Sequence, residues 1–366
     1  MTTVGDVVAQ LERWYDPAWA EPWDSVGLVS GDPDRQVEAV HVAVDPVEAV
    51  AAEAAERGAG LLVTHHPLFL GGTSSMARTG PKGRALALVD ALFVAHTNAD
   101  VADPGVSDAL AATLGVTGLV PLQSQDVLLD RWVVHVPRTH TPALLDAMAA
   151  AGAGRFGDYE RCAFTAVGEG TFTPLAGAQP YVGTVGTAET VEENRLEMVA
   201  DPRHRAAIGR AVRAAHPYEA PSVTVVPASA PSTRGLGRVG TLSQTLALQD
   251  FCGVIADRLP RTSWGLRASG DPTTPIRSVA VAGGACLDLV ELAATAGADV
   301  LVTSDAKHHR AQEAPIPVID VAHWAGEWPW TEALGQRLRH ALPGVTVTVS
   351  ELVTDPWTTH RAGSSP

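Results

Sequence analysis

Two adjacent histidines follow a short apolar run in the first quarter of the chain. The run Leu61–Thr64 has the composition of a buried strand, and His65 and His66 come directly after it. Asp100 follows the next apolar run, Leu92–Ala95, after a short polar segment. In open α/β sheets, ligands gather beyond the carboxyl ends of the strands. We therefore expect these three side chains to meet at one edge of a sheet.

A second pair of candidate ligands lies near the C-terminus. His323 and Glu327 follow the apolar run Val318–Asp320. If a helix begins at His323, these two residues stand at positions i and i+4 and share one face. Helices use this spacing to present two ligands to one metal cluster. Gly326 lies between them and works against the helix, because glycine is a poor helix former.

Together the two groups supply three imidazoles and two carboxylates, a ligand set that suits two adjacent divalent metal ions. In two-metal hydrolytic sites the ions lie roughly 3.5–4 Å apart, close enough for a carboxylate to bridge them. Imidazole with carboxylate suits Zn, Fe, Mn or Co and does not choose among them. Either group alone has a simpler interpretation as hydrogen-bonded or solvated residues. Their joint occurrence favours two metal ions per chain.

Such a centre allows two classes of function. In a metal-dependent hydrolase, water made acidic by two cations attacks a ring C–N bond or a phosphoester bond. The alternative is a non-enzymatic metal-binding or regulatory scaffold protein, which stores or delivers metal or senses a signal through part of its chain. The sequence contains no P-loop or other purine-reading motif, so a nucleotide and another phosphoester remain equally open as substrates.

The elements that must position the first group form a β-α-β unit. Ala39–Val44 is β-prone, an alanine-rich helix is expected over 46–58, and the strand Leu61–Thr64 follows. This order and length predict a parallel sheet, hence an α/β fold. Further helices are expected over Val4–Tyr15, behind a Thr-containing cap, and over Val106–Leu114, which stops at a glycine.

The second half of the chain repeats this pattern. Ala293–Thr303 aligns with Ala54–Thr64, and the apolar runs before both segments fall into register. The repeated strand also ends in polar residues, because Ser304 and Asp305 stand where the first half has two histidines. A repeat of this length indicates two related α/β halves rather than a solenoid.

The stretch between the halves has a different pattern, a β-α-β…α-β order within about one hundred residues, which favours a small ferredoxin-like α+β insert. The expected boundaries are 1–125 for the first α/β half, 126–232 for the insert, and 233–366 for the second α/β half.

The composition of the chain indicates the compartment in which the protein is expected and the classes of partner that it is not expected to bind. The 366-residue chain has a formal net charge of −15, which repels nucleic acid phosphates and anionic lipids. Its cysteines, Cys162, Cys252 and Cys286, are far apart and form no CxxC pair, as expected in a reducing compartment. No signal peptide and no run of ~18 apolar residues is present. We therefore expect a cytoplasmic protein that binds neither nucleic acid nor membrane.

Short motifs spread over nearly the whole chain carry a family resemblance. Around the candidate ligands they are Trp23–Leu28, Thr64–Pro67, His96–Asp100 and Ala322–Glu327. The others are Gly152–Arg155, Asp158–Glu160, Gly170–Phe172, His216–Glu219, Gly235–Arg238 and Thr303–Asp305. In this order they resemble the Nif-three-like family of dinuclear-metal proteins, often labelled GTP cyclohydrolase I type 2 homologues.

The resemblance implies specific roles and partners. His66 and Asp100 would bind one ion, His65 and His323 the other, and Glu327 would bridge both. It also implies a duplicated three-layer α/β core, a ring-like homo-hexamer, and a small anionic or nucleotide substrate, with GTP ring opening suggested by the family label. The insert resembles the CutA-like domain of the longer family members and would cap the opening of the ring.

The chain departs from the family pattern at loops beside the site. Ser304 replaces a glycine, Cys286 ends a Gly-Gly-Ala-Cys segment in place of Gly-Gly-Ser-Gly, and His308 stands where tyrosine is more usual. None of these positions is a proposed ligand, so the departures bear on the handling of substrate. We interpret Cys286 as a core residue rather than a nucleophile.

Neighbouring residues are candidates for supporting roles. His96 and Asp305 lie beside the ligand segments and could orient imidazoles or water. Lys307 and His309 could meet an anionic substrate. The loop at Trp23–Asp24 is expected to be structural.

Overall fold

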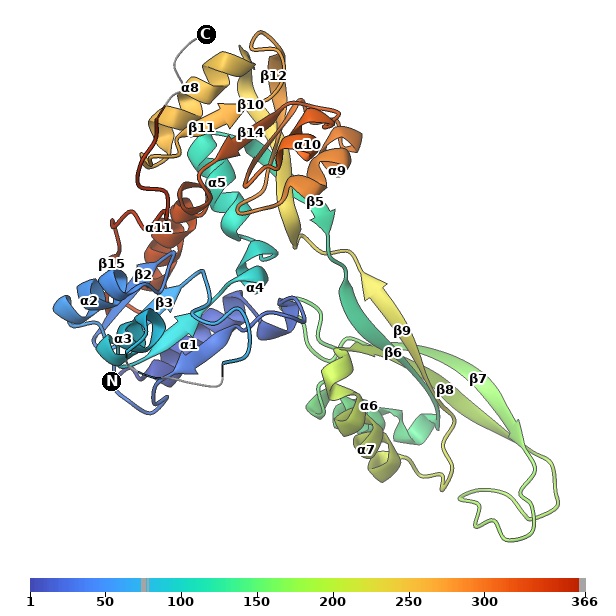
Figure 1. Cartoon of the computed structure of the whole chain (residues 1–366). Coiled ribbons are helices and arrows are strands. Elements are labelled where there is room, and N and C mark those ends of the chain that lie inside the picture. Colours follow the sequence, from blue (N-terminus) through green and yellow to red (C-terminus); the bar gives the residue numbers. More distant parts are fainter. Residues whose placement is uncertain (74–76, 78, 362–366) are drawn as a thin grey trace. The chain divides into compact units, whose positions relative to one another are not determined.

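The computed structural model describes residues 1–73, 77 and 79–361 (Figure 1). Residues 362–366, the end of the predicted second half, lie outside the described part. The chain divides into two compact units, which we call the core (1–125 with 233–366) and the insert (126–232). None of the described helices has the length and apolar character needed to cross a membrane.

The first sheet of the core contains four strands of the N-terminal half and one strand from near the C-terminus. They are β1 (Gly27–Ser30), β2 (Ala39–Ala43), β3 (Leu61–Thr64), β4 (Leu92–Val94) and β15 (Thr346–Val349). Their order is β1-β4-β3-β2-β15, parallel except for the edge strand β1. The strand β3 has the predicted bounds, and every residue in it is buried.

Helices cover both faces of this sheet. They are α1 (Val4–Trp14), α2 (Glu48–Glu56), α3 (Pro81–Leu88) and α11 (His323–Ala341). The apolar sides of α1 and α11 pack with Val40, Val42 and Val63 on one face. The opposite face, with Leu62 and Val94, packs against α2 and α3. Successive side chains of a strand point to opposite faces of the sheet, so the position of a residue along the strand decides which helices its side chain contacts.

The second sheet of the core is built from the C-terminal half and one strand of the first half. Its strands are β5 (Thr117–Ser124), β10 (Gly235–Ala247), β11 (Leu266–Ala268), β12 (Pro275–Val281), β13 (Val300–Ser304) and β14 (Val318–Val321). The order is β11-β14-β13-β12-β10-β5, in which β12, β13 and β14 are parallel. Its accompanying helices are α4 (Thr97–Asp100), α5 (Val106–Leu114), α8 (Leu248–Arg258), α9 (Val290–Thr295) and α10 (His308–Gln312). The class is therefore mixed α/β, as predicted.

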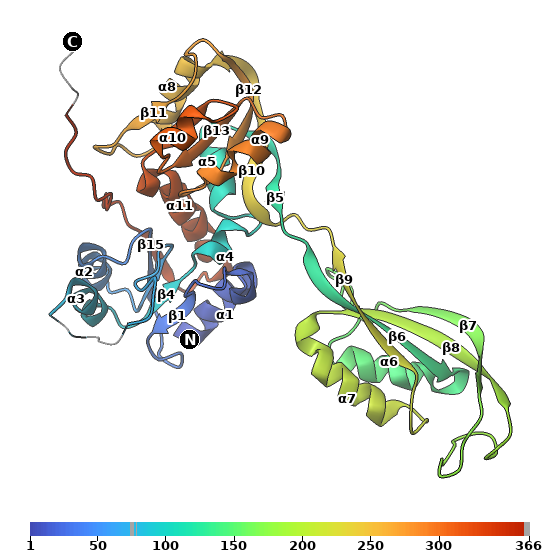
Figure 2. The same ribbon diagram turned by 45° about the vertical axis from the view of Figure 1, so that its right-hand side comes forward.

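The two sheets share one strand order and exchange one strand each. An antiparallel edge strand followed by three parallel strands occurs as β1-β4-β3-β2 and again as β11-β14-β13-β12. In exchange, β5 of the N-terminal half pairs with β10, and β15 of the C-terminal half pairs with β2 (Figure 2). The halves recognised in the sequence are therefore interlocked in one unit.

The insert is a four-stranded antiparallel sheet with two helices. Its elements are β6 (Val127–Pro137), α6 (Thr141–Ala150), β7 (Phe164–Phe172), β8 (Glu189–Ala200), α7 (Arg205–Ala215) and β9 (Val223–Ala230). The sheet order is β7-β8-β6-β9, and every pair is antiparallel. The chain order β-α-β-β-α-β is that of the split βαβ motif. Both helices pack on the face that carries Trp132, Val134 and Leu196.

Candidate metal centre

The carboxyl ends of strands from both core sheets meet around one group of polar side chains. His65 and His66 follow β3, and Asp100 ends α4, the short helix after β4. His323 and Glu327 lie in the first turns of α11, which begins directly after β14. Helix α11 starts at His323 as predicted, despite Gly326. All five predicted site residues therefore come together.

Glu327 lies at the middle of this group. Its side chain is only 3% exposed, and its Oε1 atom is 3.0 Å from Nε2 of His323, four positions earlier on the helix. Its Oε2 atom is 2.9 Å from Nε2 of His66, and Oε1 is 3.4 Å from Nε2 of His65. One carboxylate thus faces three imidazole nitrogens.

His65 is fully buried and has one ring nitrogen without a hydrogen bond. Its Nδ1 donates to the carbonyl oxygen of Ala95 at 2.9 Å, so Nε2 is the unprotonated atom of the neutral imidazole. Nε2 is 3.6 Å from Oδ1 of Asp100, and no hydrogen-bond partner for it occurs within the described residues. A buried nitrogen of this kind fits a metal ligand, because a buried polar atom without a partner is costly.

The other two imidazoles are held by carboxylates outside the group. Nδ1 of His66 lies 2.7 Å from Oδ1 of Asp45, and Nδ1 of His323 lies 2.7 Å from Oδ2 of Asp305. Each contact fixes the ring orientation and directs Nε2 toward Glu327. Metal-ligating histidines commonly have such a carboxylate on their second nitrogen. Asp305 was expected in this role from the sequence, whereas Asp45 was missed.

The distances do not match the pairing of ligands that the family resemblance implied. That pairing joined His66 with Asp100 and His65 with His323. In the structure Nε2 of His65 is beside Asp100, while the ligand atoms of His66, His323 and Glu327 all lie within 4.8 Å of one another. The imidazoles of His66 and His323 have ring centroids 5.2 Å apart. The side-chain torsions, which the sequence does not reveal, decide this arrangement.

His96 is a sixth member of the group. Its ring centroid is 5.2 Å from that of His65, and its ligand atom lies within 4.8 Å of those of His65 and His66. Asp24 accepts hydrogen bonds from Nδ1 of His96 and from the backbone and hydroxyl of Thr97. The loop at Asp24 is therefore structural, as expected, and it positions this imidazole.

Burial and mutual charge govern protonation in the group. Burial alone would raise the pKa of Glu327, but the three imidazoles outweigh it and hold the pKa well below its usual range. Burial lowers the pKa of His323, yet Glu327 acts in the opposite direction and the net result is about 9. Burial raises the pKa of Asp100 to about 6, while His65 acts to lower it. Burial, followed by the charge of His65, lowers the pKa of His96 to about 4.

A glycine turn closes the group from the side of β12. A Cβ atom on Gly283 would stand 2.6 Å from Cγ1 of Val106, and one on Gly284 would stand 2.8 Å from Oε1 of Glu327. Burial, and then the charge of Asp100, raises the pKa of the neighbouring Cys286 thiol to about 12. Cys286 is therefore a thiol at neutral pH, and it packs at the edge of a core cluster.

A cleft of about 730 Å³ opens onto the group. Its lining includes the three imidazoles of His66, His96 and His323, together with Trp264, Trp324, Trp357 and Lys82. The rings of Trp264 and Trp357 have centroids 5.8 Å apart. Lys307 and His309, the residues expected to meet an anionic substrate, are not among the described residues that line this cleft.

Comparisons with known proteins give consistent matches over the whole chain. The family model described as Duf34/NIF3 (NGG1p interacting factor 3) matches residues 2–356. A Mycobacterium leprae (strain TN) protein named "GTP cyclohydrolase 1 type 2 homolog" is 45% identical over 97% of this chain and 94% of its own length. A Bacillus subtilis (strain 168) protein of the same name is 35% identical, over 97% and 98%. The crystal structure of a Bacillus cereus protein related to NIF3 superposes with a TM-score of 0.78 at 30% identity, covering 98% of this chain and 99% of that one.

Proposed function

This chain belongs to the Duf34/NIF3 family, and from that premise we propose that its core holds two divalent metal ions and acts as a metal-dependent hydrolase. The proposed substrate is a nucleotide or another phosphoester. The names of the relatives, which refer to GTP cyclohydrolase, support a nucleotide.

One observation carries this proposal. The carboxylate of Glu327 is buried among three imidazoles, and Nε2 of His65 is buried beside it without a hydrogen bond in the described part of the chain. Three imidazoles and two carboxylates converge at this spacing and form a suitable donor set for zinc, iron, manganese or cobalt, with the imidazole protons released when metal binds. The residues present therefore fit a dinuclear centre.

The distances suggest which residues would serve each ion. His65 and Asp100 would hold one ion, His66 and His323 the other, and the two oxygens of Glu327 would be shared between them. In this assignment His65 and His66 exchange the ions that the family resemblance implied for them. It rests on the positions of their Nε2 atoms, because that of His65 lies beside Asp100 and that of His66 lies near His323 and Glu327. Which metal occupies the centre is left to elemental analysis.

The chain's own residues prepare this site for hydrolysis. When bound, two adjacent divalent ions make a water molecule acidic and polarise the bond that is cleaved. Asp45 and Asp305 hold the rings of His66 and His323, so the ligands need little rearrangement. Asp24 holds His96, a further imidazole in the lining of the cleft.

The walls of the cleft favour a substrate with a planar ring. Trp264 and Trp357 contribute indole surfaces to the cleft, whereas Trp324 is only 4% exposed. Stacking of a nucleic acid base on an aromatic side chain contributes about 1–3 kcal/mol. Lys82 adds a positive charge at the same cleft, as a phosphate group requires. A nucleotide would satisfy both features.

The remaining features of the proposal concern architecture and setting. The shared strand order of the two core sheets supports an origin by duplication of a three-layer α/β unit. The βαββαβ order of the insert supports its assignment as a ferredoxin-like, CutA-like domain.

A homo-hexamer is proposed on family grounds and is tested by the mass of the protein in solution. A cytoplasmic location is proposed because all three cysteines are free thiols.

Metal content and turnover together test the function. We expect about two ions per chain in the wild type, and loss of both metal and nucleotide hydrolysis in Glu327→Gln. Glu332→Gln is the matched control, because Glu332 lies on the same helix with its side chain 43% exposed. A metal-loaded wild type that hydrolyses no nucleotide or phosphoester faster than free metal would favour the scaffold role. A wild type that cannot be loaded with metal would overturn the whole proposal.

A further inference from the structure

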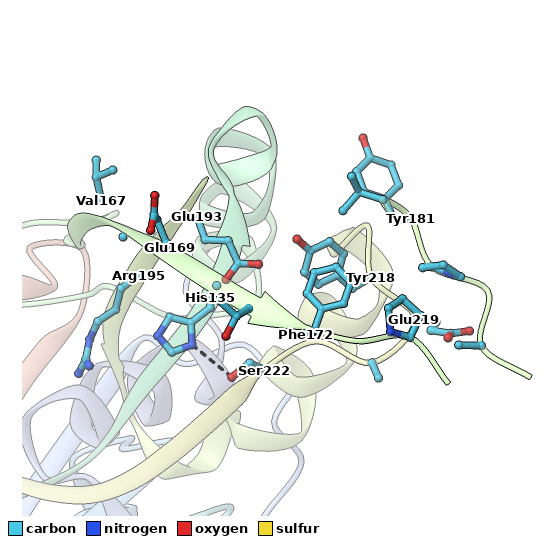
Figure 3. A pocket seen from close by; sticks show the side chains of 18 of the residues that line it. His135, Val167, Glu169, Phe172, Tyr181, Glu193, Arg195, Tyr218, Glu219 and Ser222 are labelled. Carbon is cyan, nitrogen blue, oxygen red and sulfur yellow. Dashed lines mark hydrogen bonds between the residues drawn. The ribbon is translucent and has the colours of Figure 1, made fainter. Parts of the chain in front are cut away.

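The insert contains a cavity of about 570 Å³ that the metal centre does not explain. Its lining includes Gly170–Phe172 on β7 and Tyr218-Glu219, which follow α7. These residues belong to two of the motifs that carry the family resemblance, whereas all the candidate metal ligands lie in the core. Figure 3 shows the cavity with its principal side chains.

The cavity lies on the face of the insert sheet that the helices leave uncovered. Trp132 and Val134 of β6 and Leu196 of β8 pack under α6 and α7. Successive residues of a strand point to opposite faces, so His135, Glu193 and Arg195 point the other way and line the cavity. Residues 174–182, in the connection between β7 and β8, cover part of it.

Glu193 is the unusual residue of this cavity. It is only 8% exposed, and no lysine or arginine among the described residues pairs with it. The chain makes room for its carboxylate, since a Cβ atom on Gly170 would stand 2.4 Å from Glu193 Oε2. A carboxylate buried without a cationic partner is costly, so this one is suited to a cation supplied by a ligand.

The buried imidazole of His216 does not meet that need. Burial lowers the pKa of His216, which therefore stays neutral at pH 7. Its Nδ1 accepts the backbone N–H of Tyr218, and its Nε2 donates to the carbonyl oxygen of His135. Both ring nitrogens are used, and the ring serves to fix the position of Tyr218.

Three aromatic side chains line the cavity together with this carboxylate. The ring centroid of Tyr218 is 6.1 Å from that of Phe172 and 6.2 Å from that of Tyr181. Burial, followed by the interaction of its hydroxyl group with Glu193, raises the pKa of Tyr218. Figure 3 shows the hydroxyl of Tyr218 directed toward Glu193, with the ring of Phe172 alongside. Aromatic faces attract cations, most strongly where water is excluded.

The remaining charges of the lining also favour a cation. Glu169 and Glu219 add two carboxylates. Arg195 is the one cationic side chain of the described lining, and its Nε donates to Glu197 at 2.7 Å. The cavity is therefore acidic on balance, and its positive group is already paired.

We propose that this cavity binds a small organic cation whose ammonium group lies among Phe172, Tyr181 and Tyr218 and pairs with Glu193. The insert then carries a ligand site of its own, distinct in chemistry from the metal-binding core. Binding there does not require metal, so the site is tested independently of the proposed hydrolase.

The first test compares probes of one shape and different charge. Calorimetric titrations of the full chain would use choline, its neutral isostere 3,3-dimethylbutan-1-ol, propylammonium and inorganic phosphate. We expect choline or propylammonium to bind at least tenfold more tightly than the neutral alcohol, and phosphate not to bind. Equal affinity for choline and the alcohol, preference for phosphate, or no binding of either cation would overturn the proposal.

The second test locates the site. Glu193→Gln keeps the shape of the side chain and removes its charge, so cation affinity should fall at least tenfold. Glu192→Gln is the matched control, because Glu192 is the adjacent residue on β8, is 67% exposed and pairs with Arg138 outside the cavity. Unchanged near-ultraviolet circular dichroism would show that both variants are folded. Equal cation affinity in the two variants would refute the assignment.

Discussion

The backbone of Gly284 lies against the carboxylate of Glu327, so closely that a Cβ atom on Gly284 would stand 2.8 Å from Oε1. The same residue has a φ of +74°, which side chains of L-amino acids rarely adopt. The turn after β12 therefore requires glycine for two separate reasons. One concerns backbone conformation, and the other concerns space beside the proposed shared ligand.

Replacing Gly284 by alanine should lower the metal content of the protein. The added methyl group pushes the Glu327 carboxylate from its position, and we expect at least half of the bound metal to be lost. Gly297→Ala is the matched control, because Gly297 has a φ of +79° and no atom within 4 Å of its Cβ position. Elemental analysis of both variants makes the comparison. Equal metal content would show that the crowding at Gly284 has no consequence.

Double variants should reveal which histidines share an ion. If His66 and His323 hold the same ion, His66→Ala/His323→Ala should keep about one ion per chain. The combination His65→Ala/His323→Ala disturbs both positions and should keep almost none. Cobalt-loaded protein, counted by elemental analysis, allows the comparison. The reverse result would restore the pairing implied by the family resemblance.

Removing the carboxylate behind His323 should weaken metal binding without abolishing it. Asp305 accepts from Nδ1 of His323 at 2.7 Å, and loss of such a partner typically costs 10–100-fold in metal affinity. We expect that range for Asp305→Ala in competition with a chelator. Asp288→Ala, at a side chain that is 97% exposed, should bind metal as the wild type does. A similar weakening in both variants would point to general electrostatics instead.

The buried Arg238 should be important for stability rather than for metal binding. Its guanidinium pairs with Asp108 at 2.8 Å and donates to the carbonyl oxygens of Ala102, Gly235 and Gly237. Breaking a buried ion pair costs about 3–5 kcal/mol, which we expect for Arg238→Met.

Urea unfolding followed by tryptophan fluorescence measures this loss. An exposed pair contributes at most about 1 kcal/mol, so Arg131→Met, which removes the exposed guanidinium from Glu197, should change the free energy of unfolding far less. A small loss in Arg238→Met would mean that the core tolerates the unpaired carboxylate of Asp108.

The sequence predicted the bounds of helices and strands best where the hydrophobic pattern agrees with residues that end an element, such as glycine. Leu61–Thr64 and Val106–Leu114 have the predicted bounds, the latter because Gly115 ends the helix with a φ of +76°. The helix through His323 and Glu327 was also predicted, although Gly326 argued against it. A Cβ at Gly326 would stand 3.2 Å from Cγ2 of Val321, so close packing selects glycine there over a better helix former.

Other features depend on contacts that no local pattern reveals. The bounds of β7 and β8 were not predicted, because these strands carry many exposed polar residues on the face that the insert helices leave uncovered. Asp45 was missed as the partner of His66, since its role arises only when β2 and β3 lie side by side. The arrangement of imidazoles around Glu327 depends on side-chain torsions. The cavity around Glu193 likewise needs residues that lie far apart in the chain.

The exchange of strands in the core also has a consequence during translation. Strand β2 is fully buried and, apart from His41, apolar. Strand β15 covers its outer edge, and His41 and Thr348 are joined by a 2.8 Å hydrogen bond. The ribosome releases β2 long before β15. Until then the nascent N-terminal half exposes an open edge of the type that templates aggregation. A premature stop codon before Thr346 would leave that edge permanently uncovered and mark the fragment for chaperones and proteases.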